Sequence, residues 1–239
     1  MAFAEKILWV VNYENLGHLL TQVVTIGATG VAIRTDNDIR TALPLFHVRD
    51  IKVFGWRWPS AARAAAMAEA AHAAGLLAQG MDGYYVDPEG APGEAYDWDL
   101  PGLDQVAVEF CQAVTAAGPG KPFGVTSHFR ARAIHPHLPW AAFFTHATVL
   151  LPQAYWRVDD GPVHHGRPDE NFAMAIDAWT QAGGAPGRIV PMAGEIAHAT
   201  PAEINLYAQT AQTHGVTSLH FYTDEAAVPG PIWQAIGAL

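Results

Sequence analysis

The chain has 239 residues, which suffices for one large domain or two small ones. Half of the residues are apolar and 15% are charged, so the chain can bury a sizeable core. The formal net charge of −10 argues against nucleic acid or an anionic membrane surface as a partner, and it disfavours tight capture of an anionic polymer. Protonation of the 12 histidines near pH 6 would offset much of that charge.

The only cysteine, Cys111, falls in a predicted helix, so no intrachain disulfide can form and the fold does not depend on an oxidising compartment. The N-terminus runs directly into an apolar segment at residues 6–11 and lacks the basic start and cleavage site of a secretory signal. No apolar stretch is long enough to span a bilayer. We therefore expect a soluble protein made in the cytoplasm, with no membrane insertion and no obligate protein partner. If it acts outside the cell, another route must export it.

Short apolar segments alternate with helix-like segments along the chain. The apolar segments lack a polar face, which is typical of parallel strands covered by helices. The pattern predicts strands at residues 7–11, 30–34, 51–55, 83–86, 123–126, 148–153, 189–192 and 218–222. Helices are expected at residues 15–26, 38–46, 60–75, 103–117, 139–146, 171–181, 201–214 and 232–239.

Two helix borders carry recognisable signals. Ser60 is expected to cap the alanine-rich third helix, and Gly75 to end it. Thr200, Pro201 and Glu203 form a capping box with proline at the first helical position.

Eight strand–helix units in 239 residues predict a single (β/α)8 TIM barrel domain spanning residues 1–239. The alternative, an open doubly wound sheet, would need a glycine-rich phosphate-binding turn after the first strand. Residues 12–17 read Asn-Tyr-Glu-Asn-Leu-Gly, which is not such a turn, so the pattern favours the barrel.

The most informative pair of residues is Asp87 and Glu89, directly after the predicted strand 83–86. Side chains two positions apart in extended chain point the same way. Two neighbouring carboxyl groups at the end of a buried strand repel each other, so one should retain its proton near neutral pH. An acid beside a carboxylate can protonate a glycosidic oxygen. The alternative is two solvated loop acids with no role.

Further polar and aromatic residues follow the other predicted strands, where barrel enzymes place their chemistry. Aromatic faces beside carboxylates and amides are suited to sugars. The tryptophans could instead cover the barrel mouth or pack under loops. These strand-end residues are Asn12, Tyr13, Glu14, Arg34, Asp36, Trp56, Arg57, Trp58, Ser127, His128, Gln153, Tyr155, Trp156, Glu195, Tyr222, Asp224 and Glu225.

Other chemistries have weaker support. The adjacent His164 and His165 cannot both face one site from a strand, and the loop pair His135 and His137 has no neighbouring carboxylate in sequence. We therefore expect no metal and no cofactor. His128 and His220 could lie in the barrel mouth as hydrogen-bonding residues, and Cys111 is expected to be buried.

Residues 82–89, Asp-Gly-Tyr-Tyr-Val-Asp-Pro-Glu, resemble the fourth-strand signature of family 18 glycoside hydrolases, which include chitinases and endo-N-acetylglucosaminidases. That signature has a first aspartate where this chain has Tyr85. The Asp-x-Glu ending and residues 121–125 also resemble family 25 lysozymes, whose compact length matches better. That family has an aspartate at the end of strand 1, where this chain has Asn12.

The resemblance implies a mechanism. Glu89 would be the general acid/base, and Asp87 would orient the substrate's N-acetyl group, whose carbonyl oxygen attacks the anomeric carbon. Tyr155 would hydrogen-bond the same amide. Since Tyr85 leaves the usual carboxyl relay incomplete, Asp224 or Glu195 would have to supply the missing charge.

Three hypotheses follow. The first is a glycoside hydrolase, such as a phage lysin or exported effector, acting on peptidoglycan or a chitin-like polysaccharide. Its substrate-binding residues would be Trp56, Trp58, Gln153, Trp156, Glu195, Tyr222 and Asp224. The second is a non-catalytic glycan-binding barrel, motivated by Tyr85 and Asn12. The third is a lyase or isomerase for a phosphorylated substrate, which Glu195 disfavours because it places an acid where a phosphate would bind.

Overall fold

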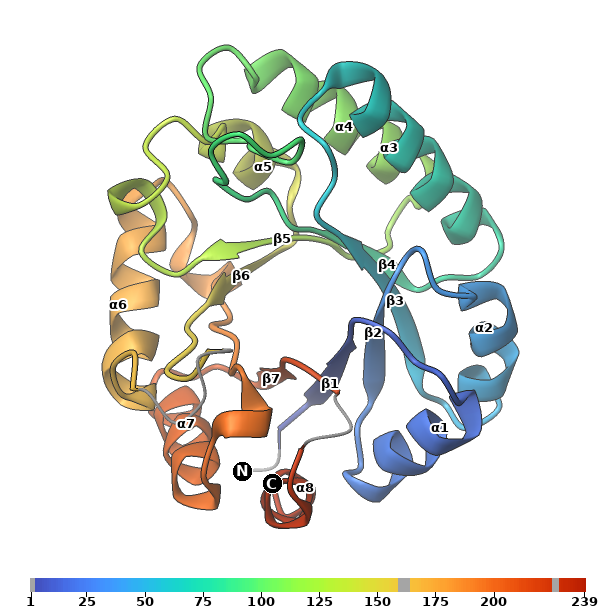
Figure 1. The fold of residues 1–239 in the computed structure, drawn as a ribbon, viewed down its shortest axis with the longest axis vertical. Coiled ribbons are helices and arrows are strands. Elements are labelled where there is room, and N and C mark those ends of the chain that lie inside the picture. Colours follow the sequence, from blue (N-terminus) through green and yellow to red (C-terminus); the bar gives the residue numbers. More distant parts are fainter. Residues whose placement is uncertain (1–2, 159–163, 225–227) are drawn as a thin grey trace.

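The computed structural model describes residues 3–158, 164–224 and 228–239. Parallel strands form a ring that is surrounded by helices, as Figure 1 shows. The strands are β1 (Glu5–Val10), β2 (Gly30–Arg34), β3 (Lys52–Arg57), β4 (Gly83–Val86), β5 (Phe123–His128), β6 (Val149–Gln153) and β7 (Ser218–Phe221). The α-helices are α1 (Leu16–Thr25), α2 (Ile39–His47), α3 (Arg63–Ala78), α4 (Asp104–Ala117), α5 (Trp140–His146), α6 (Pro168–Gln181), α7 (Pro201–Thr213) and α8 (Gly230–Gly237).

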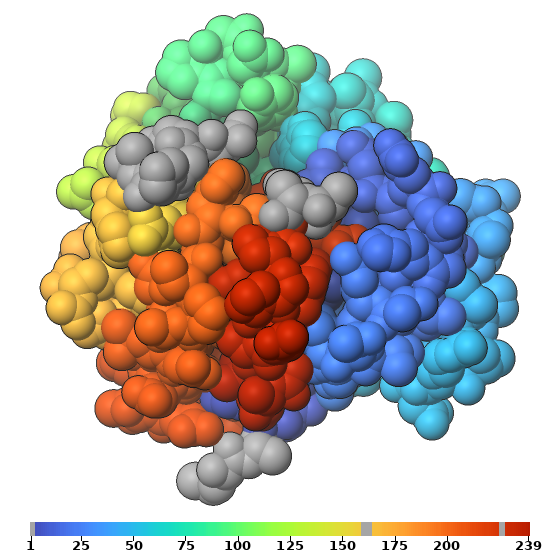
Figure 2. Space-filling model, turned by 60° about the horizontal axis from the view of Figure 1, so that its bottom comes forward, coloured from blue at the N-terminus to red at the C-terminus, as the bar shows by residue number. Residues whose placement is uncertain are grey.

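The hydrogen-bonded strands run in the order β6-β5-β4-β3-β2-β1-β7, and each pair is parallel. The last helix, α8, packs against both α1 and α7, and Figure 2 shows it in red between the blue and orange segments. None of the helices in the described residues is long and apolar enough to cross a membrane. The barrel predicted from the strand–helix alternation is confirmed.

The strand predicted at residues 189–192 is not a regular strand, but it fills the space between β6 and β7. Isolated bridges join Ile189 to Leu150 on β6 and Ala193 to Phe221 on β7. Pro191 interrupts the ladder because proline has no backbone N–H to donate. The eighth position of the barrel is therefore present as an irregular segment, which closes the ring.

One pair of helix-border predictions is wrong and another is confirmed. Helix α3 begins at Arg63, and Ser60 Oγ accepts a hydrogen bond from the N–H of Ala62 before the helix starts. Gly75 lies inside α3, which continues to Ala78. The capping box at Thr200 is present, with both reciprocal hydrogen bonds to Glu203.

The interior of the barrel is filled mainly by aromatic rings. Tyr85 on β4 stacks between Trp9 and Phe54, with ring centroids 5.3 and 5.0 Å apart. Gly124 on β5 makes room for it, since a Cβ there would lie 2.6 Å from the Tyr85 ring. Trp9 Nε1 donates to Nδ1 of the buried His220, and burial lowers the pKa of His220 to about 3. This neutral, apolar layer forms the floor beneath the barrel mouth.

Cationic side chains hold the carbonyl-bearing ends of helices against the barrel. The buried Lys6 on β1 donates from Nζ to the carbonyls of Ile26 and Ile236, after α1 and near the end of α8. Lys121 Nζ likewise donates to the carbonyls of Leu77 and Met81, at and just after the end of α3. A cation at a helix C-terminus satisfies carbonyls that have no partner within the helix and also interacts favourably with the helix dipole.

Replacing Lys6 by Met is expected to lower the free energy of unfolding by about 2–4 kcal/mol, because two buried carbonyls lose charge-assisted hydrogen bonds. The measurement is urea unfolding followed by circular dichroism. Lys52→Met is the matched control, since Lys52 makes only an exposed ion pair with Glu5, and it should change stability by less than about 1 kcal/mol. Equal midpoints for the two variants would contradict the structural role of Lys6.

Candidate active site

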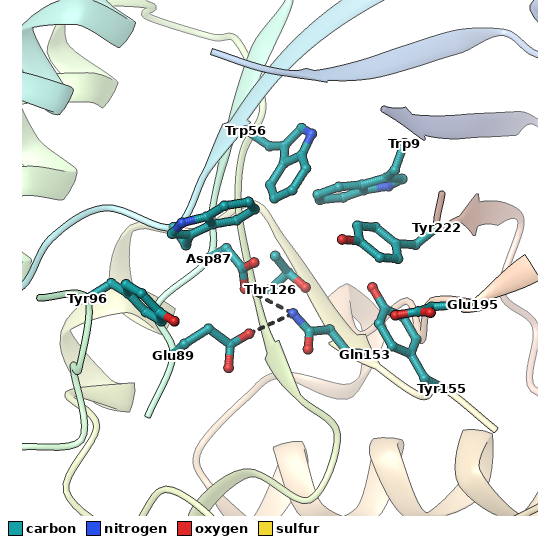
Figure 3. A pocket seen from close by; sticks show the side chains of 11 residues that line it. Trp9, Trp56, Asp87, Glu89, Tyr96, Thr126, Gln153, Tyr155, Glu195 and Tyr222 are labelled. Carbon is teal, nitrogen blue, oxygen red and sulfur yellow. Dashed lines mark hydrogen bonds between the residues drawn. The ribbon is translucent and has the colours of Figure 1, made fainter. Parts of the chain in front are cut away.

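A cavity of about 270 Å³ lies at the carboxyl ends of the strands, in the mouth of the barrel (Figure 3). Its lining combines carboxyl groups, an amide and aromatic rings. The lining residues are Trp9, Trp56, Trp58, Asp87, Glu89, Tyr96, Thr126, Gln153, Tyr155, Glu195 and Tyr222. The strand-end residues predicted for substrate binding therefore meet here, with two exceptions given below.

The carboxyl groups of Asp87 and Glu89 do face the same space. Gln153 Nε2, from the end of β6, donates to Asp87 Oδ1 and to Glu89 Oε1, each at 2.9 Å (Figure 3). The charge of Glu89 also acts on the Asp87 carboxyl group, so the two acids are close neighbours. Asp87 is 7% exposed. The alternative of two solvated loop acids is therefore wrong for Asp87, whereas the Glu89 side chain is 25% exposed.

Burial is the main cause that raises the pKa of both acids. The pKa of Asp87 is raised well above its usual range, first by burial and then by the charge of Glu89. Burial also raises the pKa of Glu89, but hydrogen bonds from Asp87 and Gln153 and the charge of His135 oppose that rise. The pair therefore retains one proton at a pH where an exposed carboxyl group has ionised.

Aromatic rings form the walls around the acid pair. The Trp56 and Trp58 rings lie 5.2 Å apart, and the Tyr155 and Tyr222 rings stack at 5.4 Å. Trp56 is fixed by a hydrogen bond from Nε1 to the Val10 carbonyl. These walls offer flat apolar faces next to the carboxyl and amide groups of the pocket, which is the combination that a pyranose ring requires.

Trp58 is supported by two arginines outside the cavity. The guanidinium of Arg34 lies 5.0 Å from the Trp58 ring, and that of Arg57 lies 5.6 Å away. Both arginines pair with Asp36 at 2.6 Å, and their hydrogen bonds and charges lower the pKa of Asp36 despite some burial. Arg34 also donates to Asn12 Oδ1. The polar residues that end β2 thus position Trp58 rather than line the pocket.

Tyr155 remains a hydroxyl donor at all working pH values. Burial, followed by the neighbouring Tyr222 and the carboxyl groups of the pocket, raises its pKa well above the usual range. Gly194 allows the ring to sit there, since a Cβ at this glycine would lie 2.6 Å from two of the ring carbons. The structure therefore places a fixed O–H donor on the wall of the cavity.

Two predicted substrate-binding residues lie elsewhere. Trp156 is completely buried, outside the cavity, and packs against Tyr207 of α7 with ring centroids 5.7 Å apart. The chain turns after β6, where Ala154 N donates to the Pro152 carbonyl, so Trp156 faces the helix layer and the prediction for it is wrong. Asp224 lines an adjacent cavity instead of the acid pocket.

That adjacent cavity has a volume of about 740 Å³ and lies at the ends of β1 and β7. It shares Glu195 and Tyr222 with the acid pocket, so the two are continuous along the barrel mouth. Its other lining residues are Val11, Asn12, Tyr13, Glu14, Asn15, His18, Leu19, Gln22 and Asp224. The predicted Glu225 lies outside the described residues.

Three residues that line the pocket were not among the predicted site residues, and His135 was considered only as a metal ligand. Trp9 and Thr126 lie within strands and point inward, and strict period-two counting from the ends of β1 and β5 could have found them. Tyr96 comes from the long loop after β4, and the His135 ring comes from the loop after β5. The local sequence does not predict that either loop residue reaches the acid pair, because the path of the loop in the folded protein decides where the residue lies.

The remaining histidine and cysteine predictions have mixed outcomes. Of the pair His135 and His137, only His135 reaches the site, and no cluster of potential metal ligands occurs in the described part of the chain. His128 sits beside His135, and burial lowers its pKa to about 4. Cys111 is buried, which raises the pKa of its thiol, so it is not an activated nucleophile.

No protein-family model and no curated protein matches the sequence. Solved structures match it in fold. A family 18 N-acetylglucosaminidase from Paenibacillus barengoltzii is 11% identical, with a TM-score of 0.69 over 98% of this chain and 99% of that one. The spore cortex-lytic enzyme SleL from Bacillus cereus is 10% identical, with a TM-score of 0.67 over 97% of this chain and 73% of that one.

A β-galactosidase from the psychrophilic Marinomonas ef1 matches equally well, at 9% identity and a TM-score of 0.70 over 98% of this chain and 58% of that one. At these identities the likeness establishes a shared barrel fold. Since barrels named for different sugars share it, the fold does not select a substrate, and the chemistry must come from the acid pair and its surroundings.

Proposed function

We propose that this protein is a glycoside hydrolase that cleaves a polysaccharide containing N-acetylhexosamine, with Glu89 as its general acid/base. The observation that carries the proposal is the pair formed by the buried Asp87 and the partly exposed Glu89, which Gln153 bridges in an aromatic pocket. A carboxyl pair that shares one proton can supply an acid and a charge-stabilising carboxylate at the same time.

In the first step, Glu89 gives its proton to the glycosidic oxygen as the bond from that oxygen to the anomeric carbon breaks. The substrate's N-acetyl carbonyl oxygen forms the new bond to that carbon, which gives a cyclic oxazolinium ion. Asp87, as the carboxylate, accepts a hydrogen bond from the amide N–H and stabilises the positive charge. The Tyr155 hydroxyl donates to the same N-acetyl group and orients it.

In the second step, Glu89 acts as the base. It takes a proton from water while the water oxygen bonds to the anomeric carbon, and the oxazoline C–O bond breaks to restore the N-acetyl group. Glu89 must hold the shared proton when the glycosidic bond breaks. A substrate amide N–H placed on Asp87 favours that arrangement, because it stabilises the Asp87 carboxylate.

The shape of the site supports a sugar polymer as the substrate. The acid pocket, at about 270 Å³, suits a single pyranose, and the continuous 740 Å³ cavity offers room for further sugars of the same chain. Among the proteins of similar fold, one is named as an N-acetylglucosaminidase and another as a spore cortex-lytic enzyme. Chitin-like oligomers and peptidoglycan glycan strands are therefore the substrates to test first.

A second candidate is a barrel that binds glycan without cleaving it. Tyr85 favours this reading, because its ring is stacked in the apolar interior where a relay carboxyl group would otherwise lie beneath the pair. Glu195 on the pocket wall is a possible source of the missing charge, whereas Asp224 lies in the adjacent cavity.

The N-acetyl requirement tests the proposal. Wild-type protein should release reducing ends from N-acetylglucosamine oligomers or purified peptidoglycan, and the same oligomers after chemical deacetylation should react at least about 10²-fold more slowly, since they lack the internal nucleophile. Equal rates on both would contradict the substrate-assisted mechanism. Oligomer binding by calorimetry without turnover between pH 4 and 8 would favour the non-catalytic candidate.

A further inference from the structure

His135 lies against the side of Glu89 that Gln153 does not occupy. Gln153 binds Glu89 Oε1, whereas His135 Nε2 is 3.8 Å from Glu89 Oε2. The imidazole is outside the set of residues that line the acid pocket, and only 6% of His135 is exposed. Such a residue acts on substrate only through Glu89.

The imidazole is held in place from several sides. His135 N donates to the Ala131 carbonyl, and Trp140 Nε1 donates to the His135 carbonyl, each at 2.9 Å. Gly90 gives the ring its space, since a Cβ there would lie 2.1 Å from His135 Nδ1. The His128 ring packs edge-on at 5.9 Å. The distance to Glu89 is therefore set by backbone contacts, and the packing leaves the ring little freedom.

We propose that His135 is a positioning residue that, when protonated, places a positive charge beside Glu89 Oε2 and extends the pH range in which the Asp87–Glu89 pair carries a single proton. The inference rests on the proposed function, since it assigns a role within the same site. It also gives the pair an ionisable neighbour on its outer side, whereas the inner side is closed by Tyr85 and the other rings of the barrel interior.

The surroundings of His135 contain groups of both signs. Glu89 faces it from the loop after β4, and Asp99 of the same loop accepts a hydrogen bond from the N–H of His137. From β5 and the loop that follows come His128, whose pKa is lowered, and the exposed cations Arg130 and Arg132. Glu89 is the acid in direct contact with the imidazole ring.

The direction of the effect follows from electrostatics. A positive His135 favours the ionised form of Glu89 and so lowers the pH at which the pair takes up its second proton. The active form carries one proton, so this charge extends activity toward acidic pH. Without the charge of His135, the pair becomes doubly protonated at a higher pH. The acidic limb of the pH–rate profile therefore shifts to higher pH.

The test is the pH dependence of kcat for wild type and His135→Gln between pH 4 and 8, on the substrate cleaved best by wild type. We expect the ratio of kcat at pH 4.5 to kcat at pH 7 to fall about 3- to 10-fold in the variant, as a shift of roughly half to one pH unit produces. KM should stay within about 2-fold, because His135 does not line the pocket. His137→Gln, an exposed residue of the same loop, is the control and should keep the wild-type profile.

Carbon-13 NMR titration measures the midpoint of the Glu89 carboxyl group directly and does not depend on catalytic activity. The Glu89→Gln variant assigns the resonance. The Glu89 midpoint should rise in His135→Gln while the melting temperature of the fold changes little. An unchanged midpoint and an unchanged acidic limb would overturn the role of His135, even with Glu89 essential for turnover. Conversely, a raised midpoint in a protein that cleaves no glycan would support the electrostatic role and overturn the proposed function.

Discussion

Glu89→Gln is expected to lower kcat on N-acetylhexosamine oligomers by about 10²–10⁴-fold, the range attributed to general acid–base catalysis. Glutamine has nearly the same shape and can still accept the Gln153 hydrogen bond through Oε1. It has no proton to transfer at the glycosidic oxygen and cannot accept one from water. KM should therefore change little while kcat falls, which indicates loss of an interaction made only in the transition state.

A substrate with an activated aryl leaving group sharpens this test. Such a leaving group needs little protonation, so the loss in bond cleavage should be much smaller for aryl glycosides than for oligomers. Glu94→Gln is the control, because Glu94 is an exposed acid in the same loop after β4, and it should retain wild-type kcat. Unchanged activity of Glu89→Gln on oligomers would rule out Glu89 as the acid.

Asp87→Asn is expected to reduce kcat by about 10²-fold or more, because the substrate's amide loses the carboxylate that stabilises its positive charge. The same variant should be more stable than wild type at neutral and alkaline pH. The pKa of Asp87 is raised in the folded protein, mainly by burial and then by Glu89. Its favourable contribution is therefore complete below its unfolded-state pKa, near about 4, and is lost as pH rises through the raised folded-state pKa.

The measurement is the melting temperature of wild type and Asp87→Asn from pH 4 to 9. The difference in favour of the variant should grow with pH and reach about 2–4 °C for each 1 kcal/mol of buried repulsion that is removed. Asp177→Asn, which changes an exposed acid on α6, is the control and should show a constant difference. If the melting-temperature difference between Asp87→Asn and wild type shrinks as pH rises, then Asp87 is ionised in the folded protein and its charge is stabilised by its neighbours.

Local sequence patterns predicted much of the barrel. The apolar strands and the capping box at Thr200 depend on contacts within a few residues, so they are readable from the chain itself. The end of α3 was misjudged because glycine in a helix interior is tolerated when packing holds the helix, as at Gly75. The irregular segment at residues 189–193 is paired through neighbours on both sides, although Pro191 prevents a continuous ladder.

Some residues of the site were also predictable from local sequence, whereas others are placed only by tertiary packing. Asp87 and Glu89 share a face because of strand geometry, and Gln153 and Tyr155 reach them because parallel strands end on one side of a barrel. Trp156, one position beyond Tyr155, faces α7 because the chain has left the strand. His135 approaches Glu89 across 46 positions of sequence, so no local pattern could place it.

The sequence by itself therefore determined the fold class, the acid pair and the aromatic character of its surroundings, since these follow from hydrophobic period, spacing and composition. The tertiary structure decided that burial raises the pKa of both acids, which aromatic rings line the pocket, and that a buried imidazole stands beside Glu89. The physical reason is that pKa values and pocket walls depend on burial and on contacts between distant segments. Those quantities exist only once the loops after β4, β5 and β6 have packed together.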